Sequence, residues 1–447
     1  MLNIRDLMAR VPSYDRFYTV DEMYRRARDV AADNPELAKL TIVGKSTDGT
    51  EIPMVTIGDG PKSVVLFALP HPNEPIGAML VQFLLDELIT NDELRSPYTW
   101  HLLTCVDPDG TRLNEGWFKG PFTVDNYARN FYRPPSAEQV EWTFPLKYKT
   151  YEWTTPIPET RALMAALDQA KPDFVYSLHN AGFGGVYYYM TPFVEGAFDE
   201  LHAIPQEQGL FMSLGEPEMP WAVEFAPAVF EMVSITKAYD YFEEFGSGDP
   251  AEQIQGGASS YDYLIDRDPA FLVTELPYFQ AKEIADQSDS GETRREVFQQ
   301  AMAQEEAMYA VQTDILERVS PLMTLDTRFL RAVTSFAEVG PKSLESKRAW
   351  VERTPGMDEP ATVASRADEL YVSVFYKLVV ASMLVRAIDA QLEATPSDVL
   401  VSARDELQGH LDQWLQLIND NLDYSPIPVQ TLVSVQFGAM LAVLNNL

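Results

Sequence analysis

The sequence contains a single cysteine, Cys105, among its 447 residues. An intrachain disulfide and a metal site built from several cysteines are therefore excluded, and imidazole and carboxylate groups remain as candidate metal ligands. Histidine is also scarce, at five residues. Basic residues are few as well: 34 Lys and Arg against 67 Asp and Glu give a net charge of −33, so we expect no nucleic-acid and no membrane-surface partner.

The N-terminal segment lacks the unbroken apolar stretch of a secretory signal, because charged residues are scattered through residues 1–17. This predicts a cytoplasmic protein. Residues 424–447 carry no charge and are numerous enough to cross a bilayer, but polar residues interrupt them. Their apolar positions recur at helical spacing, so we interpret them as a helix that is buried in the core or forms a contact in a homo-oligomer.

The order of the segments predicts an α/β fold with a mixed, mostly parallel central sheet flanked by helices, followed by an all-α C-terminal domain. Short β-rich runs alternate with amphipathic helices up to residue 279, and only long helical periods follow. We expect a catalytic domain over residues 1–319 and a helical domain over residues 320–447. The expected strands are 40–46, 51–58, 63–70, 99–106, 173–179 and 271–277; the expected helices are 20–32, 77–88, 160–170, 292–319, 327–337, 364–392 and 396–421.

The segment HPNEPIG follows the apolar strand SVVLFALP and places His71 and Glu74 three positions apart. A strand end that turns into a helix can direct an imidazole and a carboxylate at one cation, with one further ligand from a distant segment. His179 is a candidate for that ligand, since it ends the strand DFVYSLH. A structural ion pair between His71 and Glu74 is the alternative on this evidence.

Several motifs resemble the zinc carboxypeptidase (metallocarboxypeptidase) family, in the same order, over roughly Tyr18 to Val319. The opening helix and the hairpin GKSTDGTEIPMVTIG are similar to the start of the family's catalytic domain. The further motifs are HPNEPIG, DPDG, ARNF, PETRAL, SLHN and VTELP. The resemblance implies a sheet sandwiched by helices, with the active site at the carboxyl ends of central strands.

The resemblance further implies one zinc ion per catalytic domain, held by His71, Glu74 and His179, and Glu275 of VTELP as the general base. Zinc in such a site lowers the pKa of water and polarises the scissile carbonyl. A carboxylate in an apolar pocket can take a proton from that water and return it to the leaving amine. The alternative interpretation of Glu275 is a buried salt bridge.

Five more residues receive roles from the same resemblance. Arg129 of ARNF would bind the terminal carboxylate of the substrate, and Arg112 would stabilise the oxyanion. Ala128 stands where the family has an asparagine, so we expect Asn126 to take over its contact with the substrate. Asp125 would then orient His71 through its other ring nitrogen, and Ser259 would line the pocket for the terminal side chain.

The function predicted from these residues is that of a zinc-dependent carboxypeptidase, which hydrolyses the C-terminal bond of a peptide or amide with a free carboxylate. An amidase or deacylase acting on a non-peptide or cell-wall-derived amide is the first alternative, suggested by Ala128. A zinc-binding scaffold without catalytic activity is the second. The intact set of His71, Glu74, His179 and Glu275 favours an enzyme.

Overall fold

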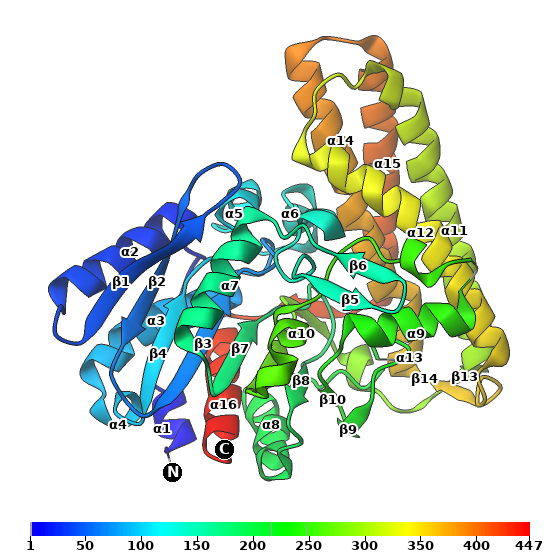
Figure 1. Ribbon diagram of the computed structural model, residues 1–447. Helices are drawn as coiled ribbons and strands as arrows, with labels where there is room; N and C mark the ends of the chain where they lie inside the picture. Colours follow the sequence, from blue (N-terminus) through cyan, green and yellow to red (C-terminus); the bar gives the residue numbers. More distant parts are fainter. Residues whose placement is uncertain (1, 216, 247) are drawn as a thin grey trace.

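A mixed nine-stranded sheet forms the centre of the computed structural model, which describes residues 2–215, 217–246 and 248–447 (Figure 1). Parallel pairs join β4 to β3, β3 to β7, β7 to β11 and β8 to β10, whereas the other neighbours, at both edges and between β11 and β8, pair antiparallel. The predicted mixed α/β fold is confirmed, with parallel pairing concentrated at the centre. In sheet order the strands are β1 (Ala38–Lys45), β2 (Glu51–Ile57), β4 (Tyr98–Leu103), β3 (Lys62–Ala68), β7 (Phe174–Leu178), β11 (Ala270–Glu275), β8 (Tyr187–Thr191), β10 (Val229–Glu231) and β9 (Glu224–Ala226).

Helices cover both faces of this sheet, and the side chains of β3 alternate between two cores. Val64 and Leu66 belong to the core that includes α2 (Val20–Asp33), α3 (Ile76–Thr90) and α16 (Val429–Leu444). Val65 and Phe67 belong to the core on the other face, with α7 (Pro158–Ala170) and α10 (Ser260–Leu264). A strand buried on both faces explains why β3 is a continuous apolar run in the sequence.

Local sequence signals account for the first elements. Thr19 and Glu22 form a capping box, in which each side chain accepts a hydrogen bond from the other's backbone N–H at the start of α2. The turn between β1 and β2 contains Gly49 at φ +86°, a left-handed conformation that glycine adopts at low cost. These signals explain why the expected helix 20–32 and the expected hairpin match the observed elements closely.

Four long helices pack against one another and project from the sheet region, at the upper right of Figure 1. The expected helix 327–337 continues through Pro341 to Arg353. The boundary predicted between residues 319 and 320 falls at the end of the first of these helices and stays a prediction. They are α11 (Arg294–Val319), α12 (Arg328–Arg353), α14 (Ser373–Ala394) and α15 (Asp398–Asn421).

The last helix, α16, returns to the sheet region and packs on α3, on α8 (Glu195–Glu207) and on α1 (Ile4–Met8). Its residues are almost all buried within the single chain, which fits the core interpretation of the uncharged C-terminal segment. Assembly into a homo-oligomer stays a prediction. Both ends of the chain lie together at the bottom of Figure 1, where the Leu2 amide donates to Asn445 Oδ1 at 2.8 Å.

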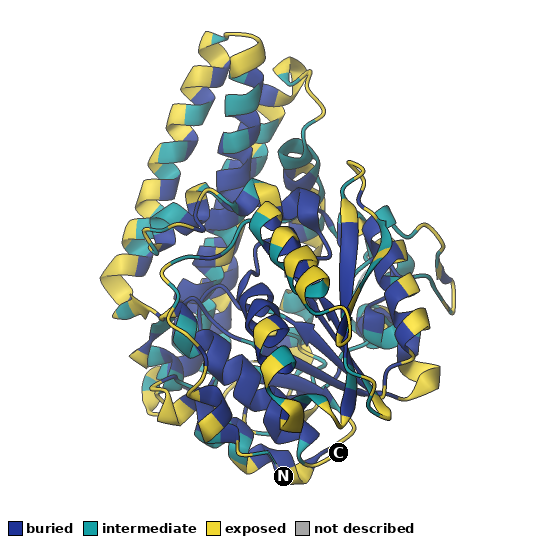
Figure 2. Ribbon diagram, turned by 90° about the vertical axis from the view of Figure 1, so that its left-hand side faces the viewer, coloured by how far each residue is buried: buried dark blue, intermediate teal, exposed yellow. Residues whose placement is uncertain are grey.

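One helical stretch, Val363–Ala394, is long and apolar enough to cross a membrane, and its most apolar 18-residue window has a mean hydropathy of 1.6. Its most apolar window is 72% buried inside the protein, where α14 packs on α11, α12 and α15. Figure 2 shows buried residues throughout the sheet, whereas the projecting helices carry exposed residues along their outer sides. This stretch is therefore a core helix of the projecting part.

Short elements complete the chain and include two strand pairs that join distant segments. Strands β12 and β15 pair, as do β13 and β14, so that residues 360–362 and 424–426 lie beside segments just after β11. The short elements are α4 (Asp92–Arg95), α5 (Pro108–Asn114), α6 (Val124–Arg129), α9 (Ile235–Phe245), α13 (Val363–Ala367), β5 (Leu146–Tyr148), β6 (Tyr151–Trp153), β12 (Phe279–Ala281), β13 (Asp289–Thr293), β14 (Pro360–Thr362) and β15 (Tyr424–Pro426).

Candidate metal centre and cavity

The carboxyl ends of three adjacent parallel strands, β3, β7 and β11, meet at one edge of the sheet. In the register of these strands Ala68 pairs with Leu178, and Leu178 pairs with Thr274. The residues that directly follow these positions are therefore neighbours in space. Sheet geometry alone thus brings His71 and Glu74 after β3, His179 after β7 and Glu275 at the end of β11 to the same place, where open α/β sheets bind their ligands.

The turn that carries His71 is held by close backbone packing. Leu69, which is fully buried, has φ +57°, a left-handed conformation that a residue with a branched side chain adopts at a cost of about 1–3 kcal/mol. Gly110 of DPDG lies against Pro72, and a Cβ at this position would come within 2.9 Å of the proline ring. The Asp107 side chain accepts from the Gly110 amide at 2.8 Å and caps α5. The DPDG motif therefore supports the turn of HPNEPIG.

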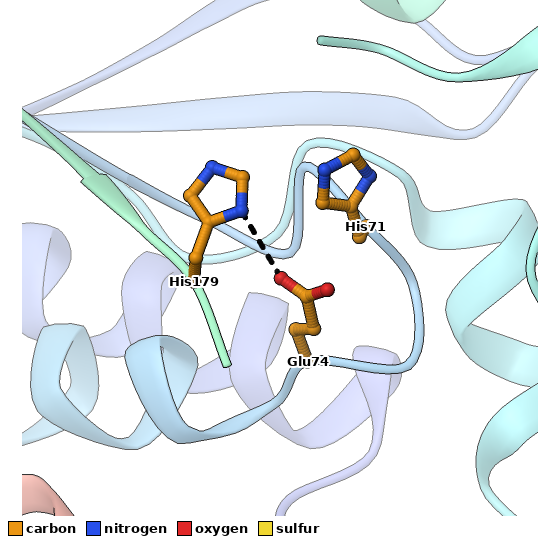
Figure 3. A group of neighbouring side chains, drawn as sticks. All are labelled: His71, Glu74 and His179. Carbon is orange, nitrogen blue, oxygen red and sulfur yellow. Dashed lines mark ion pairs between the residues drawn. The ribbon is translucent and has the colours of Figure 1, made fainter. Parts of the chain in front are cut away.

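His71, Glu74 and His179 converge, with one potential ligand atom of each within 4.8 Å of the others (Figure 3). His179 Nδ1 lies 3.3 Å from Glu74 Oε2, and the two imidazole rings are 4.9 Å apart between centroids. Two nitrogens and a carboxylate oxygen are the donor set that zinc takes in catalytic sites with a further open position. The three side chains from two distant segments thus form a group that could hold one metal ion.

His71 carries a further sign of such a role. Its Nδ1 is buried and, within the described part of the chain, has no hydrogen-bond partner. Burial, assisted by the positive charge of Arg133, lowers the pKa of His71, so the ring is neutral and its nitrogen lone pair is available. A buried polar atom without a partner is costly, and a metal ion at this point would satisfy it.

His179 is oriented by a chain of buried hydrogen bonds. Its Nε2 lies 2.8 Å from the hydroxyl of Ser177, and that hydroxyl donates to Glu141 Oε1 at 2.9 Å. Glu141 also accepts from the Ser260 amide at 2.7 Å and from the Ser260 hydroxyl at 2.9 Å. When Nε2 carries the proton and donates it to Ser177, Nδ1 is left as the free lone pair that faces Glu74.

Glu275 lies beside the group of potential ligands, with Oε1 3.8 Å from His179 Nδ1. Burial raises the pKa of Glu275, and the neighbouring Glu74 carboxylate adds to this effect. Both carboxylates line a cavity of about 450 Å³ together with His71 and His179. The arrangement places a carboxylate able to hold a proton next to three potential metal ligands in one cavity, as hydrolytic chemistry requires.

The structure corrects the position expected for Arg129, which is not among the described residues lining the cavity. Its Nε donates to Asp125 Oδ1 and its Nη2 to Asp412 Oδ1 of α15, both at 2.7 Å. Asp125 is therefore bound to Arg129 and does not orient His71. The arginine connects α6 to the projecting helices through Asp412, while Asp125, one turn earlier on α6, holds its other donor.

Arg112 and Asn126 are likewise not among the described residues of the cavity lining. Arg112 Nη2 donates to Asp21 Oδ1 at 2.8 Å, which directs it toward α2. The half-buried Asn126 donates to the Pro121 carbonyl at 3.0 Å. Ser259 does line the cavity, and its hydroxyl accepts from the Asp262 amide at 3.2 Å to cap α10.

Arg133 is a cavity residue that the sequence interpretation missed. Its Nη1 donates to Glu74 Oε1 at 2.8 Å, and its Nε donates to Gln139 Oε1 at 3.2 Å. It follows Arg129 by four residues in the segment ARNFYR, so the sequence contains a second arginine that was a candidate for the same role. Glu141 and Ser177 were missed as well, since a single glutamate in a polar loop and a single serine in an apolar strand give no local signal.

The segment that carries three of these side chains is similar to known proteins. Residues 23–216, which contain His71, Glu74 and His179, match the family model described as zinc carboxypeptidase. This segment is a zinc carboxypeptidase family domain. Glu275 lies beyond the matched segment, and its place rests on the structure.

Curated relatives match over short stretches. The chain is 28% identical over 111 residues to zinc carboxypeptidase A 1 of Drosophila melanogaster, which covers 22% of this chain and 26% of that protein. It is 28% identical over 102 residues to a zinc carboxypeptidase of Simulium vittatum, over 21% of this chain and 34% of that protein. An uncharacterized protein of Zymomonas mobilis is 25% identical over 159 residues, covering 32% of this chain and 37% of the relative. The chain thus matches between 26% and 37% of the length of these relatives.

Solved structures show a weaker likeness. Carboxypeptidase A from Helicoverpa armigera is 15% identical, with 62% of this chain and 69% of that chain covered and a TM-score of 0.40. A metallo-carboxypeptidase from Burkholderia cenocepacia is also 15% identical, over 58% of this chain and 60% of that chain, with a TM-score of 0.34. Similarity at this level assigns no substrate.

Proposed function

We propose that the protein is a zinc-dependent metallopeptidase of the carboxypeptidase type, which hydrolyses the C-terminal bond of a peptide with a free carboxylate. The observation that carries the proposal is the convergence of His71, Glu74 and His179 beside Glu275 in one cavity. The family of residues 23–216 supports the choice of a metallopeptidase.

The residues fit a zinc ion. His71 would bind through its unpartnered Nδ1, His179 through the Nδ1 that faces Glu74, and Glu74 through its carboxylate. When bound there, zinc lowers the pKa of a water molecule toward neutrality and polarises the substrate carbonyl. Glu74 is also bound to Arg133, so one of its oxygens is held in place independently of the metal.

Glu275 would hold and move the proton in this reaction. Its buried position raises its pKa, which makes the carboxylate a better proton acceptor than an exposed glutamate. It would take a proton from the attacking water and deliver it to the nitrogen of the leaving amine. The same burial excludes bulk water, which strengthens each charge interaction in the cavity.

Arg133 is the arginine placed to bind substrate oxygen atoms. A guanidinium has five donors, and the contacts to Glu74 and Gln139 use two of them. The remaining donors could bind a terminal carboxylate or the developing oxyanion, which are the roles expected from sequence for Arg129 and Arg112. Ser259 remains a candidate for contact with the terminal side chain, because it lines the cavity.

A second function, that of an amidase or deacylase without need of a terminal carboxylate, is favoured by one observation. The arginine expected to bind that carboxylate is held outside the cavity by Asp125 and Asp412. We propose it as the alternative to a strict carboxypeptidase.

The test uses purified full-length protein, zinc and a mixture of N-blocked peptides, each as free acid and as C-terminal amide. We expect zinc-dependent release of single C-terminal residues that a chelator abolishes and that Glu275→Gln reduces by at least about 100-fold. Equal cleavage of the amides would favour the amidase. Absence of any zinc-dependent cleavage, with stoichiometric zinc bound, would refute the hydrolase and favour the scaffold.

A further inference from the structure

The cavity beside Glu275 is closed on one side by the projecting helices. Glu305 of α11, Lys347 of α12 and Lys377 of α14 line it together with the potential metal ligands. Tyr376 of α14 also lines it, and its hydroxyl accepts from the Gly182 amide at 3.3 Å, three residues after His179. The helices thus form a wall of the cavity and contact the loop that carries a potential zinc ligand.

The charges on this wall are unusual for the molecule. The net charge of the chain is −33, and the cavity lining includes the carboxylates of Glu74, Glu141, Glu218 and Glu275 in addition to Glu305. Arg133 is bound to Glu74 near the metal group. Lys347 and Lys377 are the other two cations among the described lining residues, and both come from the helical wall.

The two ammonium groups share one carboxylate. Lys377 Nζ lies 3.1 Å from Glu305 Oε2, and Lys347 Nζ lies 3.5 Å from Glu305 Oε1. Lys347 also binds Glu369 at 2.7 Å, from outside the cavity lining. The wall therefore carries two ammonium groups and two carboxylates, of which Lys347, Lys377 and Glu305 line the cavity.

Both lysines are held ready to bind a further acceptor. Each ammonium has three donors; Lys347 donates to Glu369 at 2.7 Å and pairs with Glu305, and Lys377 pairs with Glu305, so these contacts engage at most two donors on each. Their side chains are only 25% and 21% exposed, so little rotamer freedom remains to be lost on binding. Although burial opposes their charge, the glutamates raise the pKa of both, and both stay charged at neutral pH.

We propose that Lys347 and Lys377 form a subsite for a carboxylate group carried by a residue of the substrate beside the scissile bond, so that the preferred substrates are acidic peptides. This inference rests on the proposed hydrolytic function. A buried ammonium discriminates strongly between a carboxylate and its neutral amide isostere, because the local dielectric constant is low. Hydrogen bonds to charged groups correspond to at least about tenfold in affinity.

The test compares substrates that differ only in this charge. N-blocked Glu-Phe is paired with Gln-Phe, and N-blocked Phe-Glu with Phe-Gln. Dissociation constants are measured by calorimetry on the zinc-loaded, full-length Glu275→Gln variant, so that binding is separated from turnover. We expect the acidic member of one pair to bind at least about tenfold more tightly than its amide. Equal affinities in both pairs would overturn the inference.

Substitutions test whether Lys347 and Lys377 are the residues that form the subsite. In the same background, Lys347→Met and Lys377→Met should bring the ratio of affinities close to one. Lys282→Met is the matched control, because Lys282 is an exposed lysine with an ion pair to Asp423, and it should leave the ratio unchanged. Lysine variants that fold, bind zinc and keep the full preference would contradict the proposal.

Glu305→Gln gives an independent result of opposite sign, which matters if loss of a lysine unfolds the protein. Removing the carboxylate that both lysines share frees them for the substrate, so the preference for the acidic peptide should increase severalfold. A decrease would refute the subsite.

If neither peptide is hydrolysed by the wild-type enzyme while the acidic one still binds better, the proposed reaction is wrong and the subsite stands. A loss of discrimination between free acid and C-terminal amide in the lysine variants would instead assign the lysines to the terminal carboxylate and overturn this proposal.

Discussion

Removal of the Ser177 hydroxyl should weaken zinc binding without touching a zinc ligand. This hydroxyl lies between Glu141 Oε1, at 2.9 Å, and His179 Nε2, at 2.8 Å. In Ser177→Ala the ring of His179 loses the partner that holds the proton on Nε2, and Nδ1 is no longer fixed as the lone pair facing Glu74. Groups that orient a metal-bound histidine are worth about 10–100-fold in metal affinity.

The hydrogen bonds of Ser177 give a closer value for the expected loss of zinc affinity. Two hydrogen bonds are lost, one of them to a buried carboxylate, and together they correspond to about 2–3 kcal/mol. We therefore expect the zinc dissociation constant to rise about 30- to 150-fold, measured by competition with a chromophoric chelator on the full-length protein. The measurement does not depend on catalytic activity.

Ser260→Ala is the matched control. The Ser260 hydroxyl donates to the same oxygen, Glu141 Oε1, at 2.9 Å, but the ring of His179 is bound by Ser177 instead. Ser260→Ala should change zinc affinity by less than about threefold, and Ser177→Thr, which keeps a hydroxyl, should restore most of the affinity. Unchanged affinity in Ser177→Ala, or equal losses in both alanine variants, would refute the reasoning.

Three more predictions concern the same cavity and its support. Glu275→Gln should lower turnover by at least about 100-fold while zinc binding, measured with the chelator, stays within a few fold. Arg133→Ala should reduce kcat/KM by at least about tenfold, whereas Arg129→Ala should lower the melting temperature and leave kcat/KM nearly unchanged; the reverse pattern would restore the role expected for Arg129. Burial raises the pKa of Asp107 to about 7 from its ordinary value of 3.8, so folding stability falls as the pH rises through this range. Asp107→Asn keeps the cap on Gly110 and should be about 2–4 kcal/mol more stable at pH 8 but not at pH 4, measured by denaturant unfolding; equal stability of the two proteins at pH 8 would contradict this.

The parts of the site that could be predicted from the sequence are those set by single strands. A strand followed by a turn fixes where its last residues lie, and parallel neighbours end at the same edge. His71, Glu74 and His179 each follow such a strand, so local patterns made them candidates, whereas Glu275 was assigned through the resemblance of VTELP to the family. The expected fold succeeded for the same reason, since long apolar runs and caps are local signals.

The direction of the Arg129 side chain could not be predicted from local sequence. Its partner Asp412 is 283 positions away, on a helix whose location depends on the packing of the whole projecting part. A motif that matches a family fixes the order of residues, whereas the direction of a long side chain depends on the charges that surround it. Two carboxylates outside the cavity hold Arg129, and Glu74 inside it holds Arg133.

The place of the two lysines of the helical wall could not be predicted from local sequence either. Lys347 and Lys377 lie on helices that sequence patterns place in a separate region, and no spacing connects them with HPNEPIG. The helix that carries Lys347 continues through Pro341, where Gly340 lies so close to Tyr309 of α11 that a Cβ would be 2.5 Å from its ring. That close approach holds α12 against α11, and it sets Lys347 beside Glu305. Substitution of Gly340 by alanine should therefore separate the two helices at this point, and the preference for an acidic peptide should fall together with the stability of the projecting helices, even though residue 340 contacts no substrate.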